Sequence, residues 1–332
     1  MAQAIGLGTI FGVSAFESTY GTAATIDRRL EIVTDTIQRQ QNVQESEGIS
    51  GDLSFARKSA RRTLITHKAA GSTTHELAKT GLGIIFNAMT GGTSTIAQQA
   101  STTAYLQTHT VGGMAGKSLT IQRALRDSGG TQVMPVTHLG CKVASWELTV
   151  SSESIPQLTI TWDCQQEVKS VASTTLVGLS APAGSNFSYQ GVSVTLGGAT
   201  VDDAFDLTLS CENPMSTDRF GLGTSNLQRE PDRNAFINFT GTLTADFTNT
   251  ADFYDRFVAD TGVPLVATFT GDEIESPYDE ELKITVPKVH LTGSTPTTSG
   301  PDLLQIDGPF TAAHDGTNSL YTIEYTSTDT TI

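Results

Sequence analysis

The sequence predicts a mainly β fold with two tandem antiparallel β-sandwich or barrel domains, each flanked by one α-helix. Three observations lead to this prediction. Several segments alternate apolar and polar residues with the period of two that a half-buried strand requires. Each half of the chain holds one apolar stripe with helical spacing. Three short landmarks also recur in the same order in both halves, which indicates a duplicated unit.

The landmarks divide the 332 residues into four parts. The matched segments are residues 24–27 with 199–202, 51–54 with 241–244, and 74–77 with 250–253. The segment between the two copies is rich in Ser, Gly and Ala, as is typical of a linker. The predicted parts are an N-terminal arm at residues 1–23, a first domain at 24–175, a linker at 176–198 and a second domain at 199–332.

The clearest predicted strand covers residues 235–247. Its apolar side chains, from Ile237 to Phe247, share one face, while Thr, Asn and Asp side chains occupy the other. The same alternation predicts further strands at residues 158–164, 205–211 and 321–325. Pro287 interrupts a strand at residues 282–291, which indicates an edge position or a bulge because proline cannot donate to a ladder.

Each half also predicts one helix between two strands. In the first half, Thr73 and Glu76 form a capping-box pattern before an apolar stripe at residues 77–89, and Gly91 ends the stripe. In the second half, an apolar stripe at residues 253–258 begins and ends with similar signals. We therefore expect one helix packed on each antiparallel β domain.

The sequence lacks the patterns of common catalytic and metal sites. The six His residues are scattered, without the spacing of metal ligands. Cys164 and Cys211 fall on apolar strand faces, so we expect buried thiols. A GKS sequence at residues 116–118 resembles the end of a phosphate-binding loop. However, Val111 stands where that loop requires Gly, and the residues that follow alternate like a strand. We predict no catalytic residue, cofactor or metal.

Charge is distributed unevenly along the chain. The net charge is −15, but residues 1–170 carry 14 basic and 13 acidic side chains, so the rest of the chain carries all of the excess. Such acidity repels a phosphate backbone, although improved solubility is an alternative explanation. No apolar stretch is long enough to span a bilayer, and the first residues lack the basic region of a signal peptide. We expect neither membrane insertion nor export.

Two long polar segments occupy matching positions in the two halves, at residues 35–48 and 212–232. Loops of this length in a compact domain are usually functional or disordered, and the matching positions favour a function. The polar stretch at residues 93–111 fits no predicted element and is left unplaced.

Four segments of the chain show a further pattern. They are ITHKAAGSTTHELAKTGLGIIFNAMTGG, KSLTIQRAL leading to HLGCKVASWELTVSSESIPQLTITWDCQ, FTGTLTADFTNTADFYDRFVADTGVPLVATFTGD, and LKITVPKVHLTGSTPTTSGPDLLQIDGPFTAAHDGTNSLYTIEY. With these segments the chain resembles the tail tube (major tail) proteins of long-tailed bacteriophages. The resemblance implies β-sandwich domains with a flanking helix, six of which close a ring around a channel. Stacked rings then form the conduit for the genome.

The resemblance also implies partners and a location. With two domains per chain, three chains suffice for a ring of pseudo-six-fold symmetry, and six chains are the alternative. The expected partners are further copies of the chain, the tape measure protein, the tail terminator and the distal tail proteins. DNA is expected to pass through the lumen without tight binding. The chain would reside in the virion tail, and in the host cytoplasm during assembly.

The resemblance makes the long polar segments candidates for contacts between rings. The candidate residues are Arg28, Arg29, Arg39, Glu45 and Glu47, opposite Asp218, Arg219, Glu230 and Asp232. The alternative is that these are solvated loop charges. We also expect a channel lined by net negative charge, mostly from the second half, because each Lys or Arg bound to a phosphate would add an attachment point.

Three other classes of protein remain open. A cell-surface or pilus-like adhesin shares the Thr-rich strands but requires an export signal. A secretion-system tube follows the same physics but usually has one domain per subunit. An enzyme on a β scaffold requires a cluster of catalytic groups, which the sequence does not show.

Overall fold

The computed structural model describes residues 3–49, 57–169, 174–180, 184–223, 226–251, 253–293, 295–298, 300–301 and 303–332. Strands dominate, and the pairs that they form are antiparallel, so the predicted mainly β, antiparallel class is confirmed. The α-helices of the described residues are short: α1 (Gly83–Thr90), α2 (Thr174–Gly178) and α3 (Tyr254–Ala259).

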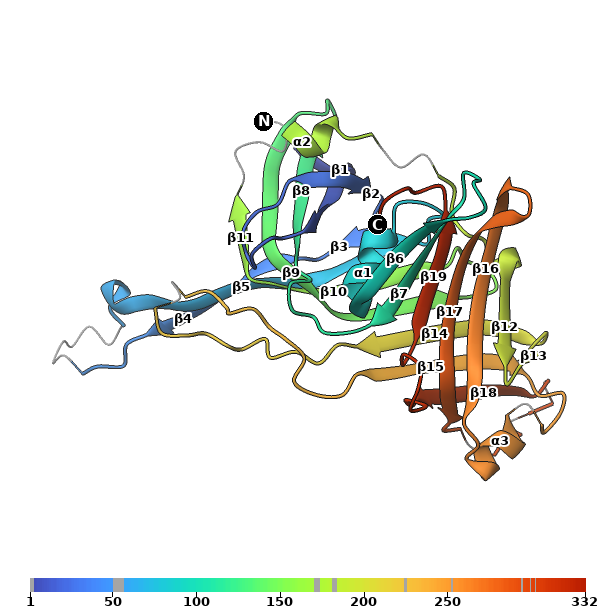
Figure 1. Cartoon of the computed structure of the whole chain (residues 1–332). Coiled ribbons are helices and arrows are strands. Elements are labelled where there is room, and N and C mark those ends of the chain that lie inside the picture. The colour runs from blue at the N-terminus through green and yellow to red at the C-terminus, as the bar shows by residue number, and fades with distance from the viewer. Residues whose placement is uncertain are drawn as a thin grey trace.

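A long twisted sheet forms one layer of the molecule (Figure 1). In spatial order its strands are β4 (Gln38–Glu45), β5 (Arg62–Glu76), β10 (Gln157–Cys164), β9 (Gln132–Val150), β14 (Ala204–Glu212), β15 (Asn238–Asp246) and β18 (Gln305–Ala312). The short strand β3 (Thr34–Asp35) pairs with β5 and continues into β4. We call this layer the long sheet.

Two further sheets pack on one face of the long sheet. The N-terminal sheet contains, in order, β2 (Ile26–Leu30), β1 (Ala4–Phe16), β8 (Leu119–Asp127), the first part of β9 and β11 (Gln166–Lys169). The C-terminal sheet contains β13 (Ala199–Thr200), β12 (Val192–Leu196), β16 (Val263–Glu275), β17 (Tyr278–Leu291), β19 (Thr322–Ser327), β7 (Tyr105–Val111) and β6 (Gly91–Gln98). Both sheets share one hydrophobic core with the long sheet.

The two halves of the chain repeat the same strand pairings. The order β2–β1–β8–β9–β11 corresponds to β13–β12–β16–β17–β19. In the long sheet, β4–β5–β10–β9 corresponds to β14–β15–β18–β17, since the end of β17 pairs with β18. Both β9 and β17 are long strands shared by two sheets. The two halves therefore share one topology, with the hairpin β6–β7 added to the first.

The predicted domain boundaries stay a prediction. The predicted arm, residues 1–23, contains β1, and the predicted linker, residues 176–198, contains β12. Landmarks 24–27 and 199–202 fall at the corresponding strands β2 and β13. Residues 51–54 of the second landmark lie outside the described residues, and the strand register matches Gly71, opposite Trp162, to Gly241, opposite Phe310. The third landmark does not match, because Thr74 to Glu76 end β5 whereas Thr250 and Phe253 precede α3.

Three strand predictions are confirmed in detail. Residues Phe239 and Leu243 of β15 are buried, as the alternation predicted. All three cysteines are buried and free. Pro287 lies at a bulge, because the register of β16 and β17 shifts between the pairs Leu265–Val286 and Val263–Val289. The stretch left unplaced, residues 93–111, falls within the hairpin β6–β7, which pairs with β19.

The first predicted helix is partly wrong. Its end at Gly91 is confirmed, since Gly91 has the left-handed conformation typical of a helix C-cap, with φ of 71°. Its start is wrong, because Thr73 and Glu76 belong to β5 and the helix begins at Gly83. The ladder with β10 continues to Glu76, and the Thr73 hydroxyl accepts a hydrogen bond from Trp162 Nε1 at 2.9 Å. Tertiary pairing thus overrides the local capping signal.

A candidate channel surface and assembly contacts

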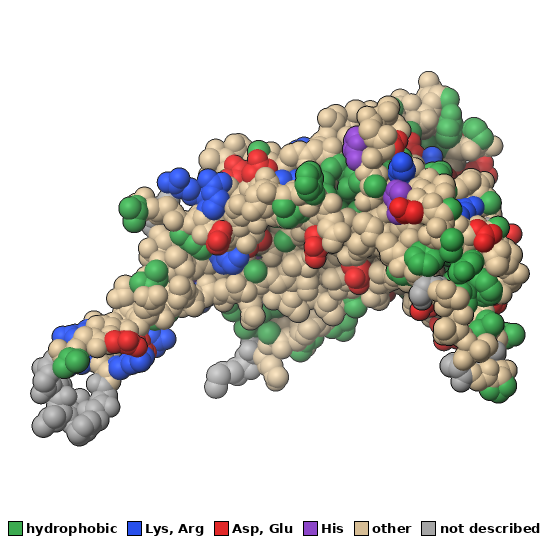
Figure 2. Space-filling view, turned by 90° about the horizontal axis from the view of Figure 1, so that it is seen from below, with side chains coloured by type: hydrophobic (Ala, Val, Ile, Leu, Met, Phe, Trp, Pro, Cys, Tyr) green, Lys and Arg blue, Asp and Glu red, His purple; other side chains and the backbone are tan. Residues whose placement is uncertain are grey.

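The outer face of the long sheet carries mainly polar side chains. Along each strand the side chains that alternate with the core residues point away from the two covering sheets. In four adjacent strands these outer positions are mostly Ser, Thr or Gln: Gln157, Thr159 and Thr161; Ser145 and Thr149; Thr208 and Ser210; Thr240, Thr242 and Thr244. Figure 2 shows the molecule from this side, where uncharged polar side chains and backbone dominate. We call it the polar face.

The charged side chains on the polar face are mainly acidic. Glu147, Asp206, Glu212 and Asp307 are exposed there. The amine of Lys68 lies on the same side but is 2.7 Å from the buried carboxylate of Asp163, which offsets its charge. The sequence predicts alternating strands at several places, but it led us to expect an exposed polar side only for residues 235–247. The outer positions of every alternating strand carried the signal that would have identified the whole face.

The two long polar segments leave the long sheet at the same end (Figure 1). In the first half, β4 and the start of β5 form a hairpin that projects beyond the body. In the second half, residues 213–223 and 226–237 run beside that hairpin, where the His67 amide donates to Asn226 O at 3.3 Å. Because the strand connections correspond, both segments occupy equivalent places and form one protruding end.

The predicted contact residues are spread over three places. Arg28 and Arg29 lie on β2 in the N-terminal sheet, where Arg28 pairs with Asp27 at 3.3 Å. Arg39 and Glu45 lie on β4, and Arg57 pairs with both Glu45 and Glu47 near the far end of the hairpin. The candidates in the second half lie in the loop before β15: Asp218, Arg219, Glu230 and Asp232. Their role between rings stays a prediction.

Glu230 already has a partner within the chain. Its carboxylate lies 2.7 Å from the amine of Lys142, whose side chain is completely buried, and accepts from the Gly116 amide at 2.7 Å. The same amine donates to the carbonyl oxygens of Met114 and Pro231. Burial lowers the pKa of Lys142, while the carboxylate opposes this effect. These contacts hold the GKS segment, which precedes a strand as predicted.

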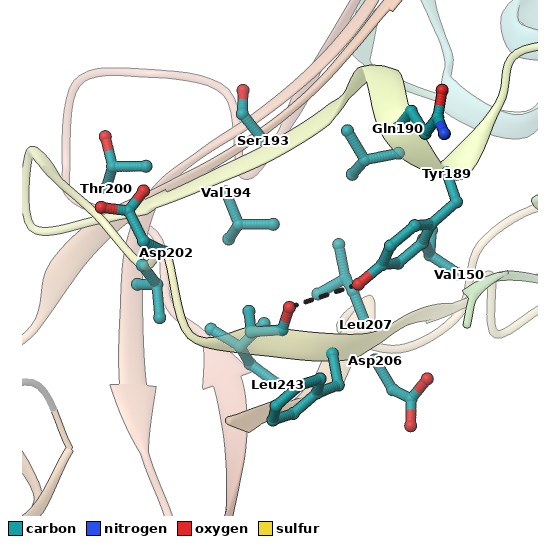
Figure 3. Close-up of a pocket in the computed structure, with 14 residues that line it drawn as sticks. Val150, Tyr189, Gln190, Ser193, Val194, Thr200, Asp202, Asp206, Leu207 and Leu243 are labelled. Atoms are coloured by element: carbon teal, nitrogen blue, oxygen red, sulfur yellow. Dashed lines mark hydrogen bonds between the residues drawn. The ribbon is translucent and has the colours of Figure 1, made fainter. Parts of the chain in front are cut away.

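Two grooves lie at corresponding places in the two halves. One lies between β12 and β14 and has a volume of about 330 Å³ (Figure 3). Its carboxylates, Asp202 and Asp206, point in different directions, so they form no acid–base pair. The other groove, of about 480 Å³, lies between β1 and the segment that contains β3. The first groove is lined largely by aliphatic and aromatic side chains, whereas the second also carries the charged side chains of Arg29, Glu31, Asp35 and Arg123.

Three buried histidines are held in the neutral form. Burial lowers the pKa of His75 and of His109 to about 4, and that of His138 to about 3. They are separate core residues, and the described residues contain no group of three or more His, Cys, Asp or Glu arranged to hold a metal. None of the helices in the described ranges has the length and apolar character that a membrane span needs.

Comparison with protein families agrees with this architecture. The family model described as phage tail tube protein matches residues 9–312, which is most of the chain. A comparison with curated proteins gives no match. The matched range includes most of both halves, with the polar face and the protruding hairpin, and ends before β19. With its antiparallel double-layered fold and a family model matched along most of its length, the chain belongs to the phage tail tube protein family, whose members are structural components of the virion tail.

Proposed function

We propose that this chain polymerises into rings of three copies, which stack into the hollow tube through which phage DNA enters the host. Each chain contributes two tube domains, so three chains give a ring of pseudo-six-fold symmetry. The tape measure protein would fill the tube before ejection, and the terminator and distal tail proteins would bind its ends. Assembly would take place in the host cytoplasm.

The observation that carries this proposal is the pairing of β9 with β14. It joins the long-sheet strands of the two halves edge to edge, over six residue pairs from Leu207–Val150 to Glu212–Ser145. If the two halves are equivalent domains, the β9–β14 pairing is one of the domain–domain contacts of a ring, and it is formed within a single chain. Repeating one heterologous contact until the rotation closes produces a ring.

The polar face supports its assignment to the channel. Ser, Thr and Gln side chains offer hydrogen bonds to water, and the exposed carboxylates repel phosphates. Without an excess of Lys and Arg, DNA gains few attachment points and slides freely. The opposite face of the long sheet is buried under the other two sheets, so the polar face is the one free to line a lumen.

Electron microscopy tests the proposal directly. The purified chain, concentrated and viewed in negative stain, is expected to form hollow rings or rods. Particles that remain single copies at all concentrations would contradict it and would favour an adhesin-like or enzymatic role.

A further inference from the structure

Two of the three cysteines lie opposite each other on paired strands. Cys141 belongs to β9, and Cys164 is the last residue of β10. Two pairs on either side of them share one register: Asp163 with Lys142, and Gln166 with Leu139. Between these pairs the register places Cys164 directly opposite Cys141. The Cβ atoms of directly opposite residues are roughly 4.5–5.5 Å apart, which a disulfide can bridge after a small adjustment.

The two thiols contact each other inside the core. Both side chains are 0% exposed, and both belong to the core that the three sheets share. Burial raises the pKa of both thiols, and the hydrogen bond between them raises the pKa of Cys141 further while it lowers that of Cys164. This pattern corresponds to the Cys141 thiol as donor and the Cys164 sulfur as acceptor. The two sulfur atoms are therefore neighbours.

Cys211, the third cysteine, is out of reach of both. It lies opposite Trp146, five residues beyond Cys141 along β9, and its thiol donates to the Tyr321 hydroxyl at 3.8 Å. Five residues of a strand span roughly 16 Å, whereas a disulfide requires Cα atoms less than about 7 Å apart. Cys211 therefore provides an internal reference, being as buried as the other two but without a second thiol at bonding distance.

The pair lies where β9 passes from one sheet to another. Cys141 pairs with Leu119 of β8 in the N-terminal sheet, whereas Val143 pairs with Trp162 of β10 in the long sheet. A bond between Cys141 and Cys164 would join the two strands at this crossing. In the unfolded chain the same bond would close a loop over residues 141–164, and such a closure stabilises the folded state.

We propose that Cys141 and Cys164 form a modification site at which a hydroperoxide converts the two thiols into a disulfide. The Cys164 sulfur attacks one oxygen of hydrogen peroxide, the O–O bond breaks, and Cys164 becomes a sulfenic acid as one water leaves. The Cys141 sulfur then attacks the Cys164 sulfur, and the S–O bond breaks as a second water leaves. Two thiols are oxidised to one disulfide, and one peroxide is reduced to two waters.

This inference goes beyond the proposed function and does not depend on it. Cytoplasmic thiol pools keep cysteines reduced, whereas disulfides persist outside cells, where the tail of a released virion is found. The chain folds with two thiols and gains the disulfide afterwards. Because burial disfavours the reactive thiolate of both residues, oxidation is slow, and the disulfide serves as a permanent bond rather than as a rapid redox sensor.

Peptide mapping tests the bond directly. The purified, folded chain is incubated with hydrogen peroxide, its remaining thiols are blocked with N-ethylmaleimide in urea, and it is then digested with trypsin. Cleavage after Lys142 separates Cys141, in peptide 127–142, from Cys164, in peptide 143–169, so the disulfide would hold these two peptides together. Mass spectrometry should find them joined and lighter by two hydrogen atoms. Cys211, in peptide 170–219, should remain a blocked thiol.

Two variants provide the comparison. Cys141→Ala removes one member of the pair, and Cys211→Ala, at the equally buried reference position, is the matched control. Peroxide should raise the urea midpoint of the wild type and of Cys211→Ala by roughly 0.5–1 M, and should leave that of Cys141→Ala unchanged.

The peptide map of the wild type decides the outcome even if a variant fails to fold. Peptides 127–142 and 143–169 that stay separate after oxidation of the folded chain would overturn the proposal. Disulfides that include Cys211 in equal yield would also overturn it, because they would show oxidation of unfolded molecules. Neither result would bear on whether the chain assembles into rings.

Discussion

Lys142 Nζ lies 2.7 Å from Glu230 Oε1, and this ion pair fastens the long loop of the second half onto strand β9 of the first. Because Lys142 is completely buried, its charge depends on that carboxylate and on two carbonyl oxygens. Losing one partner of such a pair leaves an uncompensated buried charge. The pair therefore links the loop to the fold of the whole chain.

Glu230→Gln should lower the free energy of unfolding by about 2–3 kcal/mol, because the buried Lys142 amine loses its counter-charge. Urea unfolding followed by tryptophan fluorescence measures this change. Asp232→Asn, which alters an exposed carboxylate two residues away, is the control and should change stability by less than about 0.5 kcal/mol. Equal effects of the two substitutions would show that the pair has no structural role.

Acid should destabilise the chain through its buried histidines. The folded-state pKa of His75 and of His109 is about 4, and that of His138 is about 3, all below the unfolded value near 6.5. The unfolded chain thus binds protons more tightly. The contribution of these histidines to the free energy of unfolding is fully present above pH 6.5. It is lost as the pH drops from 6.5 towards 3–4, by up to about 1.4 kcal/mol per pH unit for each histidine.

His138→Leu should weaken this pH dependence. Among the described residues neither ring nitrogen of His138 has a hydrogen-bond partner, and the Glu167 carboxylate lies 3.9 Å from Nδ1, so the change loses little at pH 7.5. Urea unfolding of both proteins from pH 7.5 to pH 4.5 measures the difference. A variant whose stability falls with acid as steeply as that of the wild type would contradict the assignment.

Reversing charges on the polar face should make the tube retain DNA. Tubes with Glu147→Lys and Glu212→Lys should bind a short duplex at least tenfold more tightly than the wild type, and the gain should fall steeply with salt. Glu273→Lys with Asp279→Lys, at the exposed turn between β16 and β17, is the control. Co-sedimentation of labelled duplex measures binding. Equal binding of the duplex by the two variants would contradict the assignment of the polar face to the channel lining.

Charge reversal at the hairpin should shorten tubes without disrupting rings. Among the described residues, Glu45 and Glu47 pair with the exposed Arg57 at 3.3 and 3.4 Å, and exposed pairs contribute at most about 1 kcal/mol to folding. Glu45→Lys with Glu47→Lys should therefore give folded rings that stack poorly. Adding Arg219→Glu should restore the tube length if the hairpin carboxylates contact Arg219 of the next ring in the stack. Unchanged tube lengths in electron micrographs would show that the hairpin takes no part in the contact between stacked rings.

Alternation was the most reliable signal in the sequence. The strands around Trp162, Cys211 and Phe239 each bury one face in a shared core, so hydrophobic burial fixes their period and register. The helix start failed because a capping box is a local signal. At Thr73 and Glu76, pairing with β10 contributes more than a cap does.

Residues 24–27 and 199–202 fall at β2 and β13, which have corresponding partners, but residues 51–54 lie outside the described residues and the strand register matches Gly71 to Gly241. Short patterns of Gly followed three residues later by Ser or Thr recur by chance in a Thr-rich chain, and only the strand register identifies the equivalent glycine. The hairpin β6–β7 was not predicted at all. Its strand β7 pairs with β19, more than 200 residues away, which local sequence does not show.

The mass of an isolated ring is the most direct test of the central claim, that two equivalent tube domains per chain close a ring of three. Tubes assembled from the purified chain and dissociated gently into single rings can be weighed by native mass spectrometry. We predict rings with the mass of three 35.2 kDa chains. Rings of six chains would show that each chain supplies one unit of the six-fold ring, and would contradict it.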